Sequence, residues 1–333
     1  MSNSLQLTNI GELVTANSAG VERYQNSSLC IEDGKISSIS DRNGDQIIDC
    51  GGKMVTAGFV DSHTHPVFYN KRDEEYRMRL AGATYEEIAE KGGGIISSVE
   101  GVRNASKEAL VEKVMQRMDR FIAGGTTTIE AKSGYGLNTD SELKSLSVID
   151  EVNQNHPIDM VPTFMGAHAF PKEFSNDHDA YIDLICNEMI PAVTDQGVAI
   201  FNDVFCEDKY FTVDQSRRIL EAGREHGLKP RLHADEFVDS GAAVLAGEIN
   251  AFSADHLMAV SEIGIRSIVD NDVVATLLPG TTFFLGKSNY APARKLIDNN
   301  VTVALATDFN PGSSHIQSIP FIMTLACMHM EMT

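Results

Sequence analysis

Two histidines, His63 and His65, stand one residue apart at the end of the apolar run GFVDSHTH. Alternate residues of a β-strand point to the same side, so both imidazoles can face one interior. Neutral imidazoles held side by side pack poorly in an apolar core, but they coordinate a borderline divalent metal well. His233 in LHADE and Asp308 in ATDFN would complete a set of three nitrogen ligands and one oxygen ligand. Such a set leaves room for a water molecule whose pKa the metal lowers to ~7, so hydrolysis is the predicted class of reaction.

Most of the other apolar runs end in a residue that could bind a metal or transfer a proton. A lone buried histidine is usually a hydrogen-bonded core residue, so the prediction depends on the convergence of many such groups. In a barrel of parallel strands the active site lies at the carboxyl ends of the strands, and these groups are therefore predicted to line one mouth. They are Lys132, His168, Glu207, Glu236 and His256.

The elements that must position these groups begin at residue 57. Eight nearly continuous apolar runs alternate there with helix-like segments, and such runs are typical of parallel strands covered on both faces. Eight alternations in about 275 residues predict a (β/α)8 TIM barrel, which takes ~250 residues. A doubly wound sheet is the alternative, but no GxGxxG or GxxxxGK[ST] loop follows any run. The runs end at His65, Lys132, His168, Glu207, Glu236, His256, Gly280 and Asn310.

Two of the intervening helices have clear ends in the sequence. Residues 106–125 carry an apolar stripe and stop at Gly124. Residues 212–227 open with Thr212 and Gln215 in capping-box spacing and close at a glycine.

Residues 1–56 have a different texture, with short alternating stretches such as LQLTNI and SSLCIEDGKISSIS. The pairs Asp33-Gly34 and Gly51-Gly52 separate them in the manner of tight turns. We therefore predict two domains: a small antiparallel, β-sandwich-like subdomain at 1–56 and the barrel at 57–333.

The composition is that of a globular protein, with 47 acidic and 27 basic residues and a formal charge of -20. Binding to a nucleic-acid backbone would oppose this charge, so no nucleic-acid partner is expected. The start lacks the pattern of a secretory signal, and no apolar stretch approaches the ~18 residues of a membrane span. We expect a cytoplasmic protein with no membrane partner. Five widely spaced cysteines without a CxxC pair favour reduced thiols.

Several motifs together resemble the amidohydrolase superfamily and, within it, the imidazolonepropionase family. They are VDSHTHPVF, KGGGI, EAKSGYGLN, MGAHAFP, LHADEF, SADH, LLPG and ATDFNPGSS, and the resemblance runs from about residue 5 to the end. It implies hydrolysis of the cyclic amide C–N bond of 4-imidazolone-5-propanoate to N-formimidoyl-L-glutamate in histidine degradation. It also implies one metal ion, zinc or iron, divalent or trivalent, bound by His63, His65, His233 and Asp308.

The same resemblance assigns roles to other residues. Glu236 would take a proton from the attacking water and deliver it to the leaving nitrogen. His256 would stabilise the developing oxyanion or help to move protons, and Asp308 would be a catalytic group as well as a ligand. The positions implied for substrate binding are Arg72, Tyr135, His168, Glu236, Asn310, Gly312 and Ser313.

Charge considerations agree with the assignment of Arg72. The implied substrate carries a propanoate, and a chain of charge -20 needs a local fixed cation to attract it. Arg72 can supply a bidentate fork, although a solvated charge at a helix end is the plain alternative. Arg103 is a rival for the same role.

The sequence also departs from the superfamily pattern. The run ending VFCEDKY has no lysine before Lys209 that could bridge two metals, so a two-metal centre is not expected. Family members continue for several tens of residues and return to the small sheet, which implies that this sequence is truncated at its C-terminal end. Homodimers are expected by analogy. The alternatives are another cyclic-amide or deaminating amidohydrolase and, in a different class, a non-catalytic barrel that binds a metal or a partner.

Overall fold

The computed structural model describes residues 4–17, 20–40, 44–83, 87 and 93–333 of the 333-residue chain. The chain divides into two compact units, Met1–Gly58 and Phe59–Thr333. All the candidate site residues named above belong to the larger unit.

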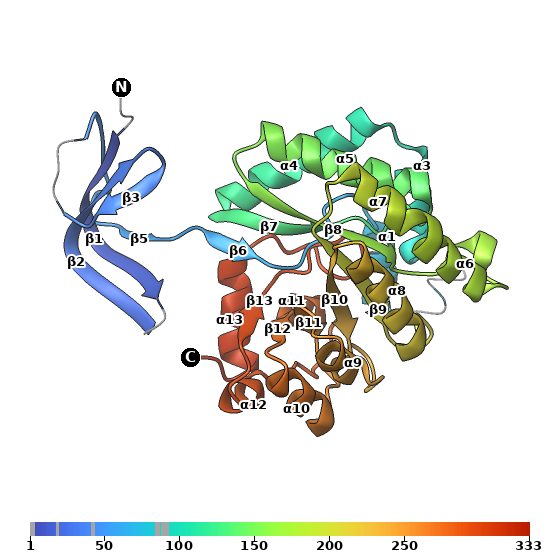
Figure 1. Cartoon of the computed structure of the whole chain (residues 1–333). Coiled ribbons are helices and arrows are strands. Elements are labelled where there is room, and N and C mark those ends of the chain that lie inside the picture. The colour runs from blue at the N-terminus through green and yellow to red at the C-terminus, as the bar shows by residue number, and fades with distance from the viewer. Residues whose placement is uncertain (1–3, 18–19, 41–43, 84–86, 88–92) are drawn as a thin grey trace. The chain divides into compact units, whose positions relative to one another are not determined.

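Eight parallel strands form the sheet of the larger unit, and they follow one another in sequence order (Figure 1). Helices alternate with them on the outside, as the periodic apolar runs predict, and the predicted TIM barrel is confirmed. The strands are β6 (Phe59–Asp61), β7 (Thr126–Lys132), β8 (Asp159–Ala167), β9 (Phe201–Cys206), β10 (Lys229–Ala234), β11 (Ser253–His256), β12 (Val274–Leu277) and β13 (Val303–Leu305).

The segments that follow the first and the last strand meet and carry predicted metal ligands. The N–H of Asp308 donates to the carbonyl oxygen of His63 at 3.1 Å, and the N–H of His65 donates to that of Phe309 at 2.8 Å. The regular ladder of β6 ends at Asp61, so both histidines lie just beyond the strand rather than within it. The backbone contacts that join these segments therefore also hold three candidate ligands in fixed positions.

The two best-marked helices begin where the sequence predicts. The side chain of Ser106 caps α4 (Lys107–Ala123), whose apolar stripe is buried. Thr212 and Gln215 form a complete capping box at the start of α8 (Val213–Glu225), which packs on β9 and β10. The other helices are α1 (Asp73–Leu80), α3 (Ile95–Asn104), α5 (Thr139–Asn155), α6 (His178–Leu184), α7 (Ile190–Gln196), α9 (Ala242–Glu248), α10 (Glu262–Asp270), α11 (Pro279–Phe284), α12 (Ala293–Asp298) and α13 (Ile319–His329), with a 3-10 turn η1 (Lys172–Phe174) and a π-helical turn η2 (Ile185–Met189).

The smaller unit is a five-stranded sheet built around β1 (Ser4–Asn17). β2 (Gly20–Glu32) pairs with β1, and β3 (Lys35–Ser38) pairs with β2, both in the antiparallel sense. β4 (Gln46–Asp49) and β5 (Met54–Thr56) run parallel to β1, so the antiparallel sheet predicted for residues 1–56 is in fact mixed. β4 pairs with the first part of β1 and β5 with a later part, and both run in the same direction as β1.

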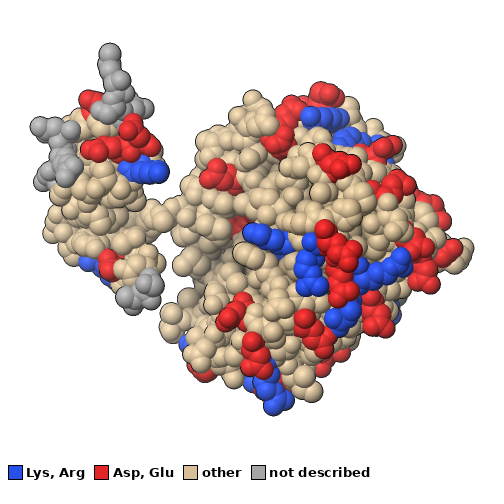
Figure 2. All heavy atoms as spheres, in the orientation of Figure 1, with Lys and Arg blue, Asp and Glu red and all other residues tan. Residues whose placement is uncertain are grey.

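Acidic and basic side chains are interspersed over the visible face of the barrel unit (Figure 2). Because the chain carries a formal charge of -20, an anionic ligand has to be attracted by particular cations at its site rather than by the general field. None of the described helices combines the length and the apolar character that a membrane crossing requires.

Candidate active site

Three imidazole nitrogens and one carboxylate oxygen converge at the carboxyl ends of the barrel strands. Nε2 of His65 lies 3.2 Å from Nε2 of His63 and 3.3 Å from Nε2 of His233. Oδ1 of Asp308 lies 3.5 Å from His63 Nε2 and 3.6 Å from His65 Nε2. Ligand atoms ~2.1 Å from a tetrahedral zinc are separated by about 3.4 Å, so the spacing of His63, His65 and Asp308, whose donor atoms all lie within 4.8 Å of one another, fits a single metal ion. His233 joins this group through its contact with His65. All four side chains are buried.

Two carboxylates behind the cluster orient its histidines. Nδ1 of His63 lies 2.7 Å from Oδ2 of Asp255, and Nδ1 of His233 lies 3.0 Å from Oδ1 of Asp203. A carboxylate accepts a hydrogen bond, so each Nδ1 carries the proton and each Nε2 presents its lone pair to the cluster. Nε2 of His65 lies between these two lone pairs and can donate at most one hydrogen bond, so at least one of the close nitrogen pairs is unsatisfied unless a cation lies between them. The donor set therefore fits a bound metal ion.

The histidines of the cluster are neutral in this environment. Burial lowers the pKa of His63, His65 and His233 well below the usual imidazole value. Burial also raises the pKa of Asp308 to about 7, and a cation held against this carboxylate would offset that effect. Metal binding requires neutral imidazoles, so the lowered histidine values favour it.

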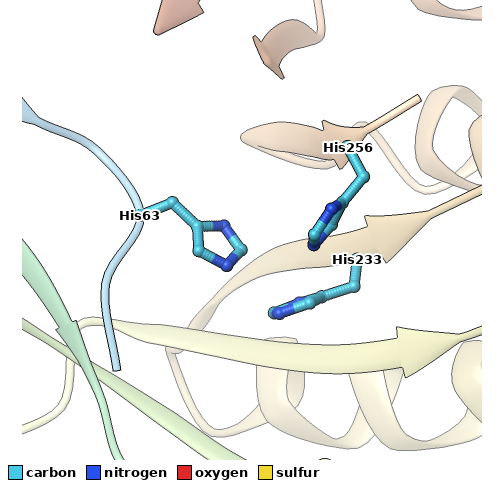
Figure 3. Close-up of side chains that lie close together, drawn as sticks. All are labelled: His63, His233 and His256. Atoms are coloured by element: carbon cyan, nitrogen blue, oxygen red, sulfur yellow. The ribbon is translucent and has the colours of Figure 1, made fainter. Parts of the chain in front are cut away.

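His256 stands beside the cluster, at the end of β11. Figure 3 shows His63, His233 and His256 from three different segments of the barrel directed toward one space, and their nearest nitrogens lie within 4.8 Å of one another. Neither ring nitrogen of His256 has a hydrogen-bond partner among the described residues, and its Nε2 lies 3.7 Å from Oε2 of Glu236. The imidazole is therefore placed to contact a ligand of the site.

Glu236 follows β10 and is fixed through the backbone of its own segment. Oε2 of Glu207, a residue that the sequence places at a strand end, accepts hydrogen bonds from the N–H groups of Phe237 and Val238. Burial raises the pKa of Glu236 well above the usual carboxyl value, and the charge of Asp308 adds to the effect. A carboxyl with a raised pKa is suited to both gaining and losing a proton near neutral pH.

A cavity of about 510 Å³ opens above these residues. His168 lies in its wall with its ring stacked on that of His65, the centroids 5.0 Å apart, and its Nδ1 is 2.9 Å from the carbonyl oxygen of Gly134. Every substrate-binding position suggested by the sequence lines this cavity. They are Arg72, Tyr135, His168, Glu236, Asn310, Gly312 and Ser313.

The loop after Asp308 is organised by Asn310. The side-chain oxygen of Asn310 accepts hydrogen bonds from the N–H groups of Gly312 and Ser313. The guanidinium of Arg72 lies so close to Gly312 that a Cβ atom there would be 2.2 Å from Arg72 Nη1. Glycine at this position therefore permits the close approach of the loop to the arginine.

The two arginines considered for the substrate carboxylate differ in their surroundings. Arg72 lines the cavity, but its Nε and Nη2 donate to both oxygens of the buried Glu75, at 2.8 and 2.6 Å. Arg103 donates to the carbonyl oxygens of Gly136 and Leu137, and it is not among the residues that line this cavity. The structure therefore gives Arg103 a role in holding the loop after β7.

The sequence pattern predicts Lys132 at the mouth of the barrel, but this lysine is fully buried, does not line the cavity and belongs to a charged layer beneath the cluster that sequence reasoning missed. Lys132 Nζ donates to Oε1 of Glu130 at 2.8 Å and to Oδ2 of Asp203 at 2.6 Å. Nη2 of Arg231 donates to Asp255 at 2.9 Å. The available signal was a charge inside an otherwise apolar parallel strand, as in AIFNDVF and AFSADH, because such a charge must find a buried partner.

Comparison with known proteins identifies the family. No protein-family model matches the chain. The imidazolonepropionase of Geobacillus thermodenitrificans is 50% identical over 320 residues, which cover 93% of this chain and 75% of that protein. The imidazolonepropionase of Treponema denticola is 49% identical over 288 residues, 86% of this chain and 70% of that protein. The chain belongs to the imidazolonepropionase family.

Solved structures outside the imidazolonepropionase family share its fold. A guanine deaminase of C. acetobutylicum with bound guanine covers 98% of this chain and is itself covered to 79%, with a TM-score of 0.68 and 18% identity. A mutant atrazine chlorohydrolase of Arthrobacter aurescens TC1, complexed with zinc and atraton, gives a TM-score of 0.74 at 14% identity, with 98% and 76% of the two chains covered. At these identities the likeness shows the fold alone.

Proposed function

We propose that this imidazolonepropionase-family chain hydrolyses the cyclic amide C–N bond of 4-imidazolone-5-propanoate and gives N-formimidoyl-L-glutamate, a step of histidine degradation. The main support is the convergence of the three imidazole nitrogens and Asp308 at the cavity, in a chain 50% identical to imidazolonepropionases. A substrate with one small ring and a three-carbon acid fits within a cavity of about 510 Å³.

The metal would be a single zinc or iron ion held by His63, His65, His233 and Asp308. When bound, it supplies a Lewis acid for the ring carbonyl and acidifies the attacking water. The oriented Nε2 atoms and the neutral state of the histidines support this ligand set. The donor atoms of His63, His65 and Asp308 all lie within 4.8 Å of one another, and so do those of His63, His233 and His256. His256 is assigned to the substrate side because its Nε2 lies 3.7 Å from Oε2 of Glu236.

The protein groups around the reacting carbon move the protons. Glu236 accepts a proton from the water as its oxygen adds to the ring carbonyl, and returns that proton to the ring nitrogen as the C–N bond breaks. His256, a neutral imidazole, donates a hydrogen bond to the oxyanion that develops on the carbonyl. Asp308 orients the attacking water. The 3.7 Å distance between Nε2 of His256 and Oε2 of Glu236 supports this division of roles, because both groups can then reach the same reacting carbon.

Substrate binding is assigned to the walls of the cavity. Tyr135 and His168 lie beside His65 and would pack against the ring. Arg72 would bind the propanoate, and the Asn310, Gly312 and Ser313 loop would hold the rest of the molecule by its backbone and side-chain groups.

A direct assay tests the proposal. Purified protein should consume 4-imidazolone-5-propanoate, seen as loss of imidazolone absorbance, with formation of N-formimidoyl-L-glutamate and about one zinc or iron per chain by elemental analysis. Deamination of guanine or opening of another cyclic amide, without turnover of the imidazolone, would favour a different amidohydrolase. Bound metal with no turnover of any of these compounds would favour a binding protein.

We also propose that the small sheet at 1–56 and the barrel at 57–333 are separate domains, which the division into compact units after Gly58 supports.

We infer a cytoplasmic homodimer whose ligand is a small molecule, with neither nucleic acid nor membrane as a partner. The charge of -20 supports the absence of a nucleic-acid partner. Sedimentation of the purified chain would determine the oligomeric state.

A further inference from the structure

We propose that Arg79 is a second guanidinium for the substrate's propanoate and that it supplies the net positive charge of this subsite. The inference rests on the proposed function and adds to it a residue that determines specificity for an acid. Arg79 lines the same cavity as Arg72, and both side chains come from the start and end of α1.

The charge of Arg72 is already balanced by a neighbour. Its Nε and Nη2 form a bidentate pair with Glu75, whose side chain is buried, and Glu75 also accepts the N–H of Gly94 at 3.1 Å. The pair as a whole has no net charge. In a chain of formal charge -20, an additional cation is therefore needed to make the subsite attractive to a carboxylate.

The position of Arg79 meets this need. Residues 72, 76 and 79 are separated by three, four or seven positions, and so are residues 72, 75 and 79, so Arg72 and Arg79 share one face of the helix. Nη2 of Arg79 donates to the carbonyl oxygen of Gly312 at 2.6 Å, and its guanidinium carbon lies 5.5 Å from the ring centroid of Phe284. These contacts fix the plane of the group. The Nε atom is buried and has no hydrogen-bond partner among the described residues.

The two guanidinium groups converge on one residue of the substrate loop. Arg72 Nη1 lies against the Cα of Gly312, while Arg79 Nη2 holds its carbonyl oxygen. Burial lowers the pKa of Arg79 and the positive charge of Arg72 lowers it further, while the negative charge of Glu75 acts in the opposite direction. Glu75 offsets part of the repulsion between the two guanidinium groups, and a carboxylate bound beside Arg79 would offset the rest and pair with its unpaired Nε.

Two lysines also line the cavity, Lys209 in the segment after β9 and Lys287 after α11. Lys287 Nζ lies 4.4 Å from the ring centroid of Phe237, in the segment that carries Glu236. Its charge acts on the catalytic carboxyl, and it lowers the pKa of Glu236 against the larger effect of burial. Arg79 differs because it touches the loop that contacts Arg72.

A binding experiment tests the role of Arg79 independently of turnover. The probes are imidazole-4-propanoate and its uncharged propanamide, with dissociation constants measured by calorimetry for the wild type and the variants Arg79→Gln, Arg79→Lys and Arg77→Gln. Arg77 is the matched control because it lies on the same helix and pairs with Glu74 at the surface. Hydrolysis of 4-imidazolone-5-propanoate is measured in parallel.

We expect the wild type to bind the acid about 10- to 100-fold more tightly than the amide. Arg79→Gln should remove most of this preference and leave amide binding nearly unchanged, Arg79→Lys should retain part of it, and Arg77→Gln should retain all of it.

A full preference in Arg79→Gln, or equal losses for acid and amide, would overturn the assignment and leave Arg79 as a structural link between α1 and the loop. If Arg79→Gln does not fold, the lysine variant decides, since an unreduced preference for the acid would contradict a guanidinium-specific role. Absence of hydrolysis by the wild type would reject the proposed function, while the acid preference would still decide the role of Arg79.

Discussion

The Nδ1 atom of His63 lies 2.7 Å from Oδ2 of Asp255, and both side chains are fully buried. The two residues are 192 positions apart in sequence. His63 follows β6, the first strand of the barrel, and Asp255 lies within β11, the sixth. This contact determines which nitrogen of His63 carries its proton, and so directs the Nε2 lone pair toward the other candidate ligands.

Substitution of Asp255 by Asn should weaken metal binding. The amide cannot match the carboxylate as an acceptor, so the preferred form of His63 is lost, and metal affinity should fall about 10- to 100-fold. The measurement is a competition titration with a chelator on metal-free protein. Asp119→Asn is the control, since Asp119 is an exposed partner of His156 and should leave the affinity unchanged. Unaltered affinity in the Asp255 variant would show that this contact does not prepare the site.

Replacement of Lys132 by Met should destabilise the barrel. The change leaves Glu130 and Asp203 buried without their shared cation, and breaking a buried ion pair in this way costs about 3–5 kcal/mol of the free energy of unfolding. Denaturant unfolding of metal-free protein measures the loss. Lys172→Met removes an exposed pair with Glu100 and should have little effect. Equal stability of the two variants would contradict the role assigned to the charged layer.

The sequence was informative where the chemistry is local, and less so where distant residues meet. Eight apolar runs sufficed to predict the barrel, because strands covered on both faces need continuous apolar character. Nothing in the local pattern shows that Asp255 supports His63, because the two residues are 192 positions apart and meet only in the fold. The pair of Arg72 and Glu75, three positions apart at the start of α1, is by contrast a local helical contact. Arg103 was a reasonable rival by charge alone, and its carbonyl partners gave it another role.

His168 should make the stability of the protein depend on pH in the acidic range. Burial lowers its pKa from 6.5 to about 4, so below pH 6.5 the unfolded chain binds a proton that the folded protein does not. The free energy of unfolding therefore falls as pH decreases from 6.5 to 4, by about 1.4 kcal/mol per pH unit for one such group. His168→Gln should reduce this slope by one proton in metal-free protein, whereas substitution of the exposed His226 by Gln should not. Parallel stability curves for the wild type and His168→Gln would exclude this contribution.

Substitution of Gly312 by Ala should impair substrate binding more than folding. The new Cβ would lie 2.2 Å from Arg72 Nη1, so either the loop or the guanidinium must move. We expect KM for the imidazolone substrate to rise about tenfold, as for the loss of a charged hydrogen bond, with a smaller change in kcat. Steady-state kinetics and a thermal melt separate the two effects. An unchanged KM would mean that Arg72 does not contact the substrate.

Substitution of Glu236 by Gln tests the proton transfer directly. The amide is nearly the same size and keeps the cavity wall, but it can neither accept the proton of the attacking water nor return it to the leaving nitrogen. Turnover should therefore fall about 10²- to 10⁴-fold, the usual contribution of a general acid or base. Metal content should be unchanged, because Glu236 lies outside the proposed ligand set, and this distinguishes lost chemistry from a lost metal. Glu225→Gln, at the exposed end of α8, is the matched control and should retain full activity. Undiminished turnover in the Glu236 variant would assign the proton transfer to another group, and the adjacent His256 would be the next candidate.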